Sequence, residues 1–487
     1  METNEQAQKE HYQEVERVLV KLVEEIDGIE DGDVKELEQK IYQGVLEIGR
    51  ELLQYRINKG GEKAPGKRMG ECGHEQDLVE YRTKQILTIL GKVEFTRAYY
   101  QCQREKEKKG EQEGQKGCCH EGSPADKIWG IDRRRTTPGV QECLSYLCAR
   151  LTFEEAAETF SRFLPLSMSA RQAQSLMEPV GKALAEREEK VLTALFEQAS
   201  QKHTSIQEQK ELLLPKSIDR LYIEMDGIME RLRRGTVAME ASEQTRKGDV
   251  YREIKVGAIF QAERGRERSQ LAPDIWVDMP KEGSMRYVAR RTAKGDFGKL
   301  LYGLAWQLGL EQAKQIVILG DGALWIWKLA SEHFPKAVQI VDLYHAQEHV
   351  WQVARAVYGP QTQAAAIWAK QACELLVHGK IEQLVAAMAA LPSLPPEPGE
   401  SRSLPEKAMD YFTTNAERMR YPAFRAQGMH VGSGIAEAAC KTVVATRLKR
   451  SGMRWTPEGL DALLPLRTSV LNQTYDEFWE GQHRLVA

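Results

Sequence analysis

Two aspartates in this sequence stand where a buried strand is expected to end, and glycine follows each of them directly. Asp226 closes the run LYIEMD, and Asp321 comes two residues after the apolar run IVIL. If the two strands are neighbours, both carboxylates lie at one edge of a sheet, where each opposes the other's ionisation. A hard divalent cation with oxygen ligands would relieve that repulsion. The pair therefore predicts a metal site with a third acidic ligand nearby, although Asp-Gly is also a common turn pair.

Glu437 is the candidate for the third ligand. It stands in the small, apolar stretch GIAEAAC, within a predicted helix over residues 433–450 that has Ser433 as its N-cap. The stretch that follows, KTVVATRLKRSGMRW, has no acidic residue and carries five basic ones: Lys441, Arg447, Lys449, Arg450 and Arg454. Metal-binding carboxylates beside a basic segment are what a metal-dependent phosphodiester enzyme needs, because the basic residues hold the phosphate backbone. The plainer alternative is a surface ion pair between Glu437 and Lys441.

In these motifs and their order, the chain resembles the DDE transposases of bacterial insertion sequences. The resemblance rests on MDG, GDGALWIW, DLYHAQEH and GSGIAEAACKTVVATRLKRSGMRW, and it covers roughly residues 220–455. It is most specific in the last three motifs, which are similar to those of the ISKra-type branch, related to the Mutator-like group. Asp342 and His345 fit the D-x-x-H signature that such transposases carry after the second aspartate.

The resemblance implies an RNase H-like α/β core, with a mixed sheet, helices on both faces and a helical insertion before Glu437. It implies that Asp226, Asp321 and Glu437 bind two Mg²⁺ ions, with Mn²⁺ as a substitute. His345 would lie near the scissile strand, although a lone histidine at a strand–helix junction is more often structural than catalytic. The implied reaction is attack by water at the transposon end, followed by attack of the freed 3′-OH on target DNA.

The implied partners are double-stranded DNA, both terminal inverted repeats and target, and further copies of this chain. Joining two ends implies a homodimer or a larger assembly. Two other functions stay open: an RNase H-like nuclease without strand transfer, and a domesticated, non-catalytic DNA-binding protein. The intact Asp/Asp/Glu set disfavours the second of these.

The elements around the carboxylates predict alternating strands and helices. Residues 220–227 and 252–263 are typical of strands, 295–309 of a helix, and 316–319 of a buried strand. A further helix, closed by Pro335, and a strand that passes into a helix within AVQIVDLYHAQEHVW follow. Such alternation predicts an α/β sheet with parallel strands, in which ligands gather at the carboxyl ends of the strands.

A helix-turn-helix is predicted upstream of this core. TFEEAAETFSRFL begins with a capping-box pair, Thr152 and Glu155, and SARQAQSLM begins with another, Ser169 and Gln172. Two short capped helices joined by a tight turn outline the motif, and a separate long helix follows from about Met177 to Ala199. Residues near the start of the second helix reach the major groove, which gives three candidate DNA contacts: Arg171, Gln172 and Gln174. Paired capped helices also occur in many α-rich proteins that bind no DNA.

The chain divides into six predicted segments, and its N-terminal part is expected to be mainly α-helical. The segments are a helical region (1–60), a cysteine-containing region with a charged loop (61–130), the helix-turn-helix and long helix (131–215), the first part of the core (216–345), the helical insertion (346–425) and the last part of the core (426–487).

The cysteines of the second segment fit a zinc ribbon poorly. Such a ribbon needs two close ligand pairs, and related transposases often carry one before the helix-turn-helix. Here one residue separates Cys72 from His74, and the charged stretch 103–117 separates Cys102 from Cys118 and Cys119. Either an insertion has interrupted the second knuckle or these are ordinary reduced thiols, and the spacing favours no structural zinc.

Composition narrows the class of protein. The 487 residues are 42% hydrophobic and 29% charged, which is ordinary for a multi-domain globular protein. No run approaches the roughly 18 apolar residues of a membrane span, and the polar, acidic start is unlike a signal segment. Eight unevenly spread cysteines do not suggest a secreted disulfide framework. We expect a cytoplasmic, nucleoid-associated protein with no membrane partner, and a net charge of −3 leaves room for local basic patches.

Overall fold

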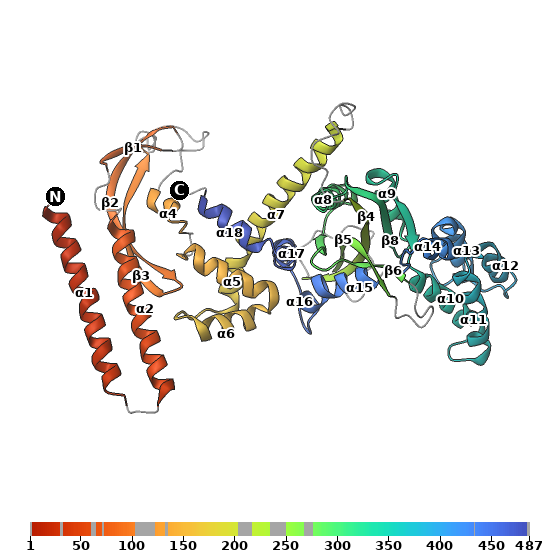
Figure 1. The fold of residues 1–487 in the computed structure, drawn as a ribbon, viewed down its shortest axis with the longest axis horizontal. Coiled ribbons are helices and arrows are strands. Elements are labelled where there is room, and N and C mark those ends of the chain that lie inside the picture. Colours follow the sequence, from red (N-terminus) through yellow and green to blue (C-terminus); the bar gives the residue numbers. More distant parts are fainter. Residues whose placement is uncertain are drawn as a thin grey trace. The chain divides into compact units, whose positions relative to one another are not determined.

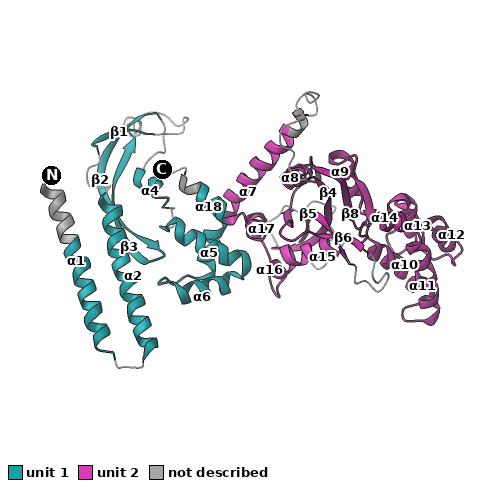
Figure 2. Ribbon diagram, in the orientation of Figure 1, with its two compact units in different colours: residues 1–180, 476–487 teal, residues 181–475 magenta. Residues whose placement is uncertain are grey.

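The computed structural model describes ten stretches of the chain, and these fall into two compact units. The stretches are residues 2–29, 33–59, 65–70, 73–102, 122–131, 135–202, 217–233, 250–266, 276–432 and 434–484. Unit 1 comprises residues 1–180 and 476–487, and unit 2 comprises residues 181–475 (Figure 2).

Unit 1 begins with a helical hairpin followed by a small antiparallel sheet (Figure 1). Helices α1 (Glu2–Asp27) and α2 (Val34–Lys59) form the hairpin, and strands β1 (Lys67–Met69), β2 (Glu75–Thr88) and β3 (Gly91–Cys102) form the sheet in that order. The prediction of a mainly helical N-terminal part did not anticipate this sheet. The middle of β2 is exposed on both faces, so its sequence lacks the apolar–polar alternation that reveals a half-buried strand.

The rest of unit 1 is helical and includes both predicted capping boxes. Its helices are α4 (Pro124–Ile128), α5 (Pro138–Arg150), α6 (Phe153–Phe163), the start of α7 (Ala170–Lys202) and α18 (Tyr475–Arg484). In the first box, the Thr152 N–H donates to the Glu155 carboxylate at 2.9 Å and the Glu155 N–H donates to the Thr152 hydroxyl at 3.1 Å. In the second, the Ser169 N–H donates to the Gln172 side-chain oxygen at 2.9 Å and the Gln172 N–H donates to the Ser169 hydroxyl at 3.3 Å. The short second helix of the motif and the long helix predicted after it are one helix, because α7 continues past Pro179 to Lys202.

Unit 2 contains a mixed sheet, as the alternation of strands and helices predicted. Its strands are β4 (Ile218–Leu232), β5 (Val250–Arg266), β6 (Trp276–Pro280), β7 (Arg286–Arg290), β8 (Ala313–Gly320) and β9 (Val338–Val341). The order is β6–β5–β4–β8–β9, with β7 also paired to β5. Strands β4, β8 and β9 run parallel, and β5 runs antiparallel to β4.

Strand β4 is longer than predicted, which corrects the position of Asp226. Its parallel pairing with β8 stops at Met225 opposite Gly320, but its antiparallel pairing with β5 continues as far as Leu232. Asp226 therefore lies within the strand and not at its end, because Gly227 stays paired with β5 and does not turn the chain. It is nevertheless the first residue beyond the parallel pairing with β8.

Helices cover both faces of this sheet, as predicted. Gly257 of β5 faces α8 (Lys294–Gln307), since a Cβ there would overlap the Leu301 side chain. On the other face, α15 (Gly434–Ala439) is bonded to Glu224 of β4 through the Ala436 N–H. Helix α9 (Leu324–His333) follows β8 and packs against α8. The core of unit 2 lies between the sheet and helices α8 and α9 and continues into the helical residues 343–431 that follow β9.

A helical segment separates β9 from α15, in the place of the predicted insertion. Its helices are α10 (Leu343–Tyr358), α11 (Gln363–Val377), α12 (Ile381–Ala389), α13 (Leu404–Thr414), the 3₁₀ helix η3 (Ala416–Met419) and α14 (Tyr421–Ala426). The proline-rich loop follows α12. Among the helices of the described stretches, none is both long and apolar enough to cross a bilayer.

The helix predicted over residues 433–450 is present as continuous helical turns from Gly434 to Leu448, with a π-helical segment in the middle. Helix α15 runs into the π-helix η4 (Cys440–Ala445), which runs into the short α16 (Thr446–Leu448), and α17 (Pro457–Leu471) follows. Ser433, the predicted N-cap, lies outside the described residues. A π-helical turn inside a helix is often found at a functional site.

Candidate active site

Strands β4 and β8 bring Asp226 and Asp321 together where their parallel pairing ends. Met225 and Gly320 are the last paired residues, and each aspartate is the residue that follows directly in the chain. Asp321 opens a tight turn, in which its Oδ1 accepts the Ala323 N–H at 2.9 Å. Its carbonyl oxygen accepts the Tyr411 hydroxyl at 2.8 Å, which ties this turn to α13.

The turn after Asp321 requires glycine. Gly322 has a φ of 101°, a left-handed conformation that side chains disfavour. A Cβ at this position would also overlap the ring of Tyr411. The glycine therefore allows Tyr411 to pack close to the backbone that carries Asp321.

The Asp226 carboxyl has an unusual electrostatic environment. Burial raises its pKa above the usual range, and the nearby charge of Asp321 raises it further. Hydrogen bonds from the Cys440 thiol and from the Gly227 N–H, at 2.7 Å, act in the opposite direction, as does the nearby His345. Two neighbouring carboxyls of which one has a raised pKa form a pair that a bound cation would stabilise.

His345 lies beside this pair, at the start of α10. Asp342 is almost fully buried and caps this helix by accepting the His345 N–H. The His345 ring lies 5.0 Å from that of His349, and the His349 ring lies 4.3 Å from that of Tyr411. Burial lowers the pKa of His349, and the charge of His345 lowers it further. The two histidines thus connect the Asp226 side of the site to the tyrosine that supports Asp321.

Glu437 lies on the same face of the sheet but does not join the aspartates. It is exposed in α15, and one helical turn later the buried Cys440 donates its thiol hydrogen to Asp226. Within the described stretches, no three acidic, histidine or cysteine side chains are close enough to hold a metal ion. The structure therefore brings Asp226, Asp321 and His345 together and leaves Glu437 at the edge of the site.

Glu224 is a further acidic residue at this site, and the sequence reasoning did not single it out. It lies two residues before Asp226 and is completely buried. Its Oε2 accepts the Ala436 N–H at 2.8 Å, and its Oε1 lies 3.1 Å from Nε2 of His430. These contacts tie the start of α15 to β4. A charged residue inside the apolar run LYIEM was the available signal in the sequence.

The basic segment after Glu437 only partly matches the predicted phosphate contacts. Lys441, Lys449 and Arg454 are exposed, and Arg450 is half-buried with a hydrogen bond from its Nε to the Thr446 carbonyl. Arg447 is fully buried, so its assignment as a DNA contact was wrong. Its guanidinium lies over the Trp455 ring, 5.3 Å from the centroid, because this side of α16 faces the core. Arg447 packs the segment from inside while its neighbours face solvent.

The predicted DNA contacts of the helix-turn-helix lie at the start of α7. Arg171 is exposed. Gln172 is exposed as well, and its side chain also closes the capping box with Ser169. Gln174 is half-buried and donates to Glu178 at 2.7 Å. Their contact with DNA stays a prediction.

That the cysteine region binds no structural zinc stays a prediction. Cys102 is buried at the end of β3, and His74 precedes β2. Cys72, Cys118 and Cys119 lie outside the described residues, as does the charged loop 103–117.

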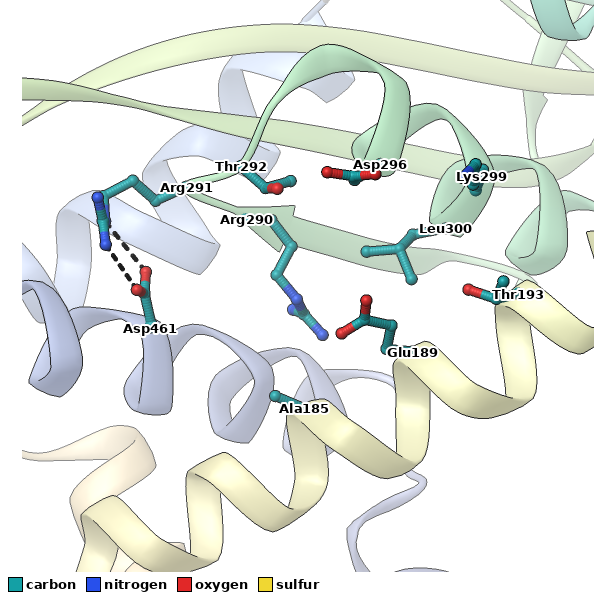
Figure 3. Close-up of a pocket in the computed structure, with 10 residues that line it drawn as sticks. All are labelled: Ala185, Glu189, Thr193, Arg290, Arg291, Thr292, Asp296, Lys299, Leu300 and Asp461. Carbon is teal, nitrogen blue, oxygen red and sulfur yellow. Dashed lines mark hydrogen bonds and ion pairs between the residues drawn. The ribbon is translucent and has the colours of Figure 1, made fainter.

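A separate cavity of about 310 Å³ in unit 2 is lined by α7, α8 and α17, with the end of β7 (Figure 3). Its charged lining residues are Glu189, Arg290, Arg291, Asp296, Lys299 and Asp461. Arg291 pairs with Asp461 through contacts of 3.1 and 2.6 Å, and Arg290 pairs with Glu188. Because its two arginines are already paired with acids, this cavity is a poor site for a phosphate.

Comparisons with known proteins match this chain to a family without an assigned activity. A family model described as an uncharacterised protein family, UPF0236, matches residues 304–479. The matched stretch contains Asp321, His345 and Glu437 but not Asp226. A Streptococcus gallolyticus protein described as "UPF0236 protein in vanSb 3'region" is 22% identical over 427 residues, which cover 84% of this chain and 77% of that protein.

Among solved structures, the chain matches the Drosophila P element transposase strand transfer complex. The match has 10% identity and a TM-score of 0.22, and it covers 70% of this chain and 80% of that one. A TM-score this low gives no support to a shared fold or function.

Proposed function

We propose that this protein is a DDE transposase, of the ISKra-type branch that its motifs resemble. It would bind the ends of a DNA element and catalyse both hydrolysis and strand transfer. The observation that carries the proposal is the meeting of Asp226 and Asp321 at the end of the β4–β8 pairing. The strand order, with β5 antiparallel between its neighbours β6 and β4, supports an RNase H-like core.

The oxygen donors of Asp226 and Asp321 suit a divalent cation, Mg²⁺ or Mn²⁺. The exposed Glu437 would complete the set by turning its side chain toward the aspartates, one of which, Asp226, the neighbouring Cys440 already contacts. Two bound cations would supply activation of the attacking oxygen and stabilisation of the leaving one. The Cys440 thiol and the Gly227 N–H would hold the Asp226 carboxylate in position, and His345 would lie against the scissile strand.

The exposed basic residues after Glu437 would hold the DNA backbone. Lys441, Lys449 and Arg454 face solvent within 17 residues of the proposed ligand, and Arg450 is partly exposed beside them. Arg171, Gln172 and Gln174 would read the terminal repeat from unit 1. Because two ends must be joined, the active species would be a homodimer or a larger assembly on DNA.

A strand-transfer assay tests this function against its two rivals. The full chain is incubated with Mg²⁺, a supercoiled plasmid and precut duplexes taken from the DNA that flanks its coding sequence. A transposase joins the duplex 3′ ends to the plasmid. A nuclease nicks or cuts without joining, and a non-catalytic protein only retards the DNA in a gel.

Cation binding should weaken as the pH falls. The folded-state pKa of Asp226 is raised, so protons compete with the cation at this carboxyl as the pH drops toward that pKa. Titration calorimetry with Mn²⁺ should therefore show lower affinity at about pH 5.5 than at about pH 7.5. In the absence of a cation, the folding stability changes with pH in the opposite direction. The raised pKa of Asp226 contributes stability at low pH, and this contribution is lost as the pH rises through that pKa. An Asp226→Asn variant that keeps wild-type affinity and pH dependence would contradict this role.

The exposed basic residues should contribute separately to DNA affinity. Replacing Lys441 or Arg454 with alanine should lower the slope of log affinity against log salt by about 0.9 for each lost phosphate contact. The folded state should persist, because both side chains are exposed. Fluorescence anisotropy over a salt series measures the slope, with Lys336→Ala, remote in sequence and also exposed, as the control. An unchanged slope in both variants would place the DNA elsewhere.

A further inference from the structure

The helical hairpin of unit 1 exposes a row of large apolar side chains that its own packing does not use. On α1 these are Leu19 and Val23, and on α2 they are Val34, Ile41, Val45 and Leu52. Each is between 41% and 62% exposed. Single exposed apolar residues are common on protein surfaces, but a contiguous set marks an interaction site.

The α2 residues form a seam distinct from the faces that α2 already packs. They recur at intervals of seven, four and seven residues, the spacing of a coiled-coil seam. Gly44 marks the face toward α1, since a Cβ there would overlap Leu22. Gln54 and Asn58 mark the face toward the sheet, where their amides bond to the backbone of β3 at 2.8–3.1 Å. The apolar row lies on neither of these faces.

The rows on α1 and α2 lie on one side of the hairpin. At about 100° per residue, Leu19 and Val23 are turned about 60° and 100° from Leu22, which faces α2. Ile41 and Val45 are turned by the same angles, about 60° and 100°, from Gly44, which faces α1. Because the two helices run in opposite directions, equal turns in the chain direction bring both rows to the same side. The hairpin therefore has one continuous apolar face, made by both helices.

The area of this face fits a stable dimer. The six side chains expose on the order of 500 Å² per chain, whereas a standard interface buries roughly 800 Å² per partner with somewhat over half of it apolar. The face thus supplies about the whole apolar share of one such interface. A two-helix face of this kind is self-complementary, because two copies related by a twofold axis form a four-helix bundle.

We propose that this face, defined by Leu19, Val23, Val34, Ile41, Val45 and Leu52, is the interface between two copies of this chain. The two hairpins pack through it into a four-helix bundle. The proposal stands on the hairpin alone and does not depend on the catalytic function, although a reaction that joins two ends would use such a dimer.

The mass of the full chain in solution, without DNA, tests the proposal. Light scattering after gel filtration, at about 10 µM, should give the mass of a dimer for the wild type and of a monomer for Ile41→Glu/Val45→Glu. Sedimentation should show the dissociation constant raised at least about 100-fold, equivalent to about 2.7 kcal/mol. Ile367→Glu, an exposed isoleucine on α11, is the matched control and should stay dimeric.

If circular dichroism shows that the glutamate pair unfolds, Ile41→Ser/Val45→Ser replaces it, since serine tests the loss of apolar area without buried charge. A wild type that is monomeric would overturn the proposal and favour a different occupant, another protein or unit 2 of the same chain. A folded variant that stays dimeric would overturn it too.

Discussion

Asp321→Asn should lower the rate of Mg²⁺-dependent end cleavage at least about 1,000-fold, equivalent to about 4 kcal/mol of transition-state stabilisation. The substitution keeps the shape of the side chain and its acceptor for the Ala323 N–H, so the turn at the end of β8 should persist. It removes the negative charge that the proposed cation needs beside Asp226. Single-turnover cleavage of a labelled duplex from the flanking DNA measures the rate.

The control for this variant is the same substitution on a neighbouring strand outside the site. Asp219 lies near the start of β4, with a side chain that is 81% exposed, and pairs with Lys314 at 2.6 Å. Asp219→Asn should cleave at the wild-type rate. If Asp321→Asn also cleaves at that rate while remaining folded, the metal site is wrongly placed. Loss of activity in both variants would instead indicate a general effect of the substitution.

Glu224→Ala should destabilise unit 2 by about 1–3 kcal/mol, the usual cost of leaving a buried donor without its acceptor. The Glu224 side chain is completely buried against His430 and the Ala436 N–H, so its removal leaves that N–H without its acceptor. Glu224→Gln should cost less, because its amide oxygen can still accept the Ala436 N–H. Urea denaturation followed by tryptophan fluorescence measures the free energy of unfolding.

Glu263→Ala, on the exposed part of β5, is the matched control and should change stability by no more than about 0.5 kcal/mol. The Glu224→Gln variant also tests the link to α15, because it is expected to remain folded. If α15 depends on this contact, the variant should cleave DNA more slowly while binding it normally. If Glu224→Ala had the same free energy of unfolding as the wild type, the contact between β4 and α15 would contribute nothing to the stability of unit 2.

Much of unit 2 follows from patterns within short stretches of sequence. The runs around Tyr222 and Ile318 are strands, and the run that begins near Val338 is a strand that passes into a helix. In unit 1, the two predicted capping boxes at Thr152 and Ser169 are present as well. Such features are set by side-chain period and by contacts over three or four residues, so they can be read without knowing the fold.

The errors arose where distant parts of the chain decide the outcome. Asp226 was placed at a strand end because Asp-Gly usually turns, yet pairing with β5 carries β4 on to Leu232. The sheet in unit 1 was missed because the middle of β2 is exposed on both faces.

The sequence by itself determined the order of acidic residues, the alternation of strands and helices, and the helix starts. Only the tertiary structure decided that Asp226 and Asp321 are neighbours, that Glu224 is the buried partner of α15, and that Arg447 is buried while Lys449 is exposed. The reason is physical. Local pattern fixes which element a residue belongs to, but the burial of a charge depends on partners that may lie 200 residues away, as Ala436 does from Glu224.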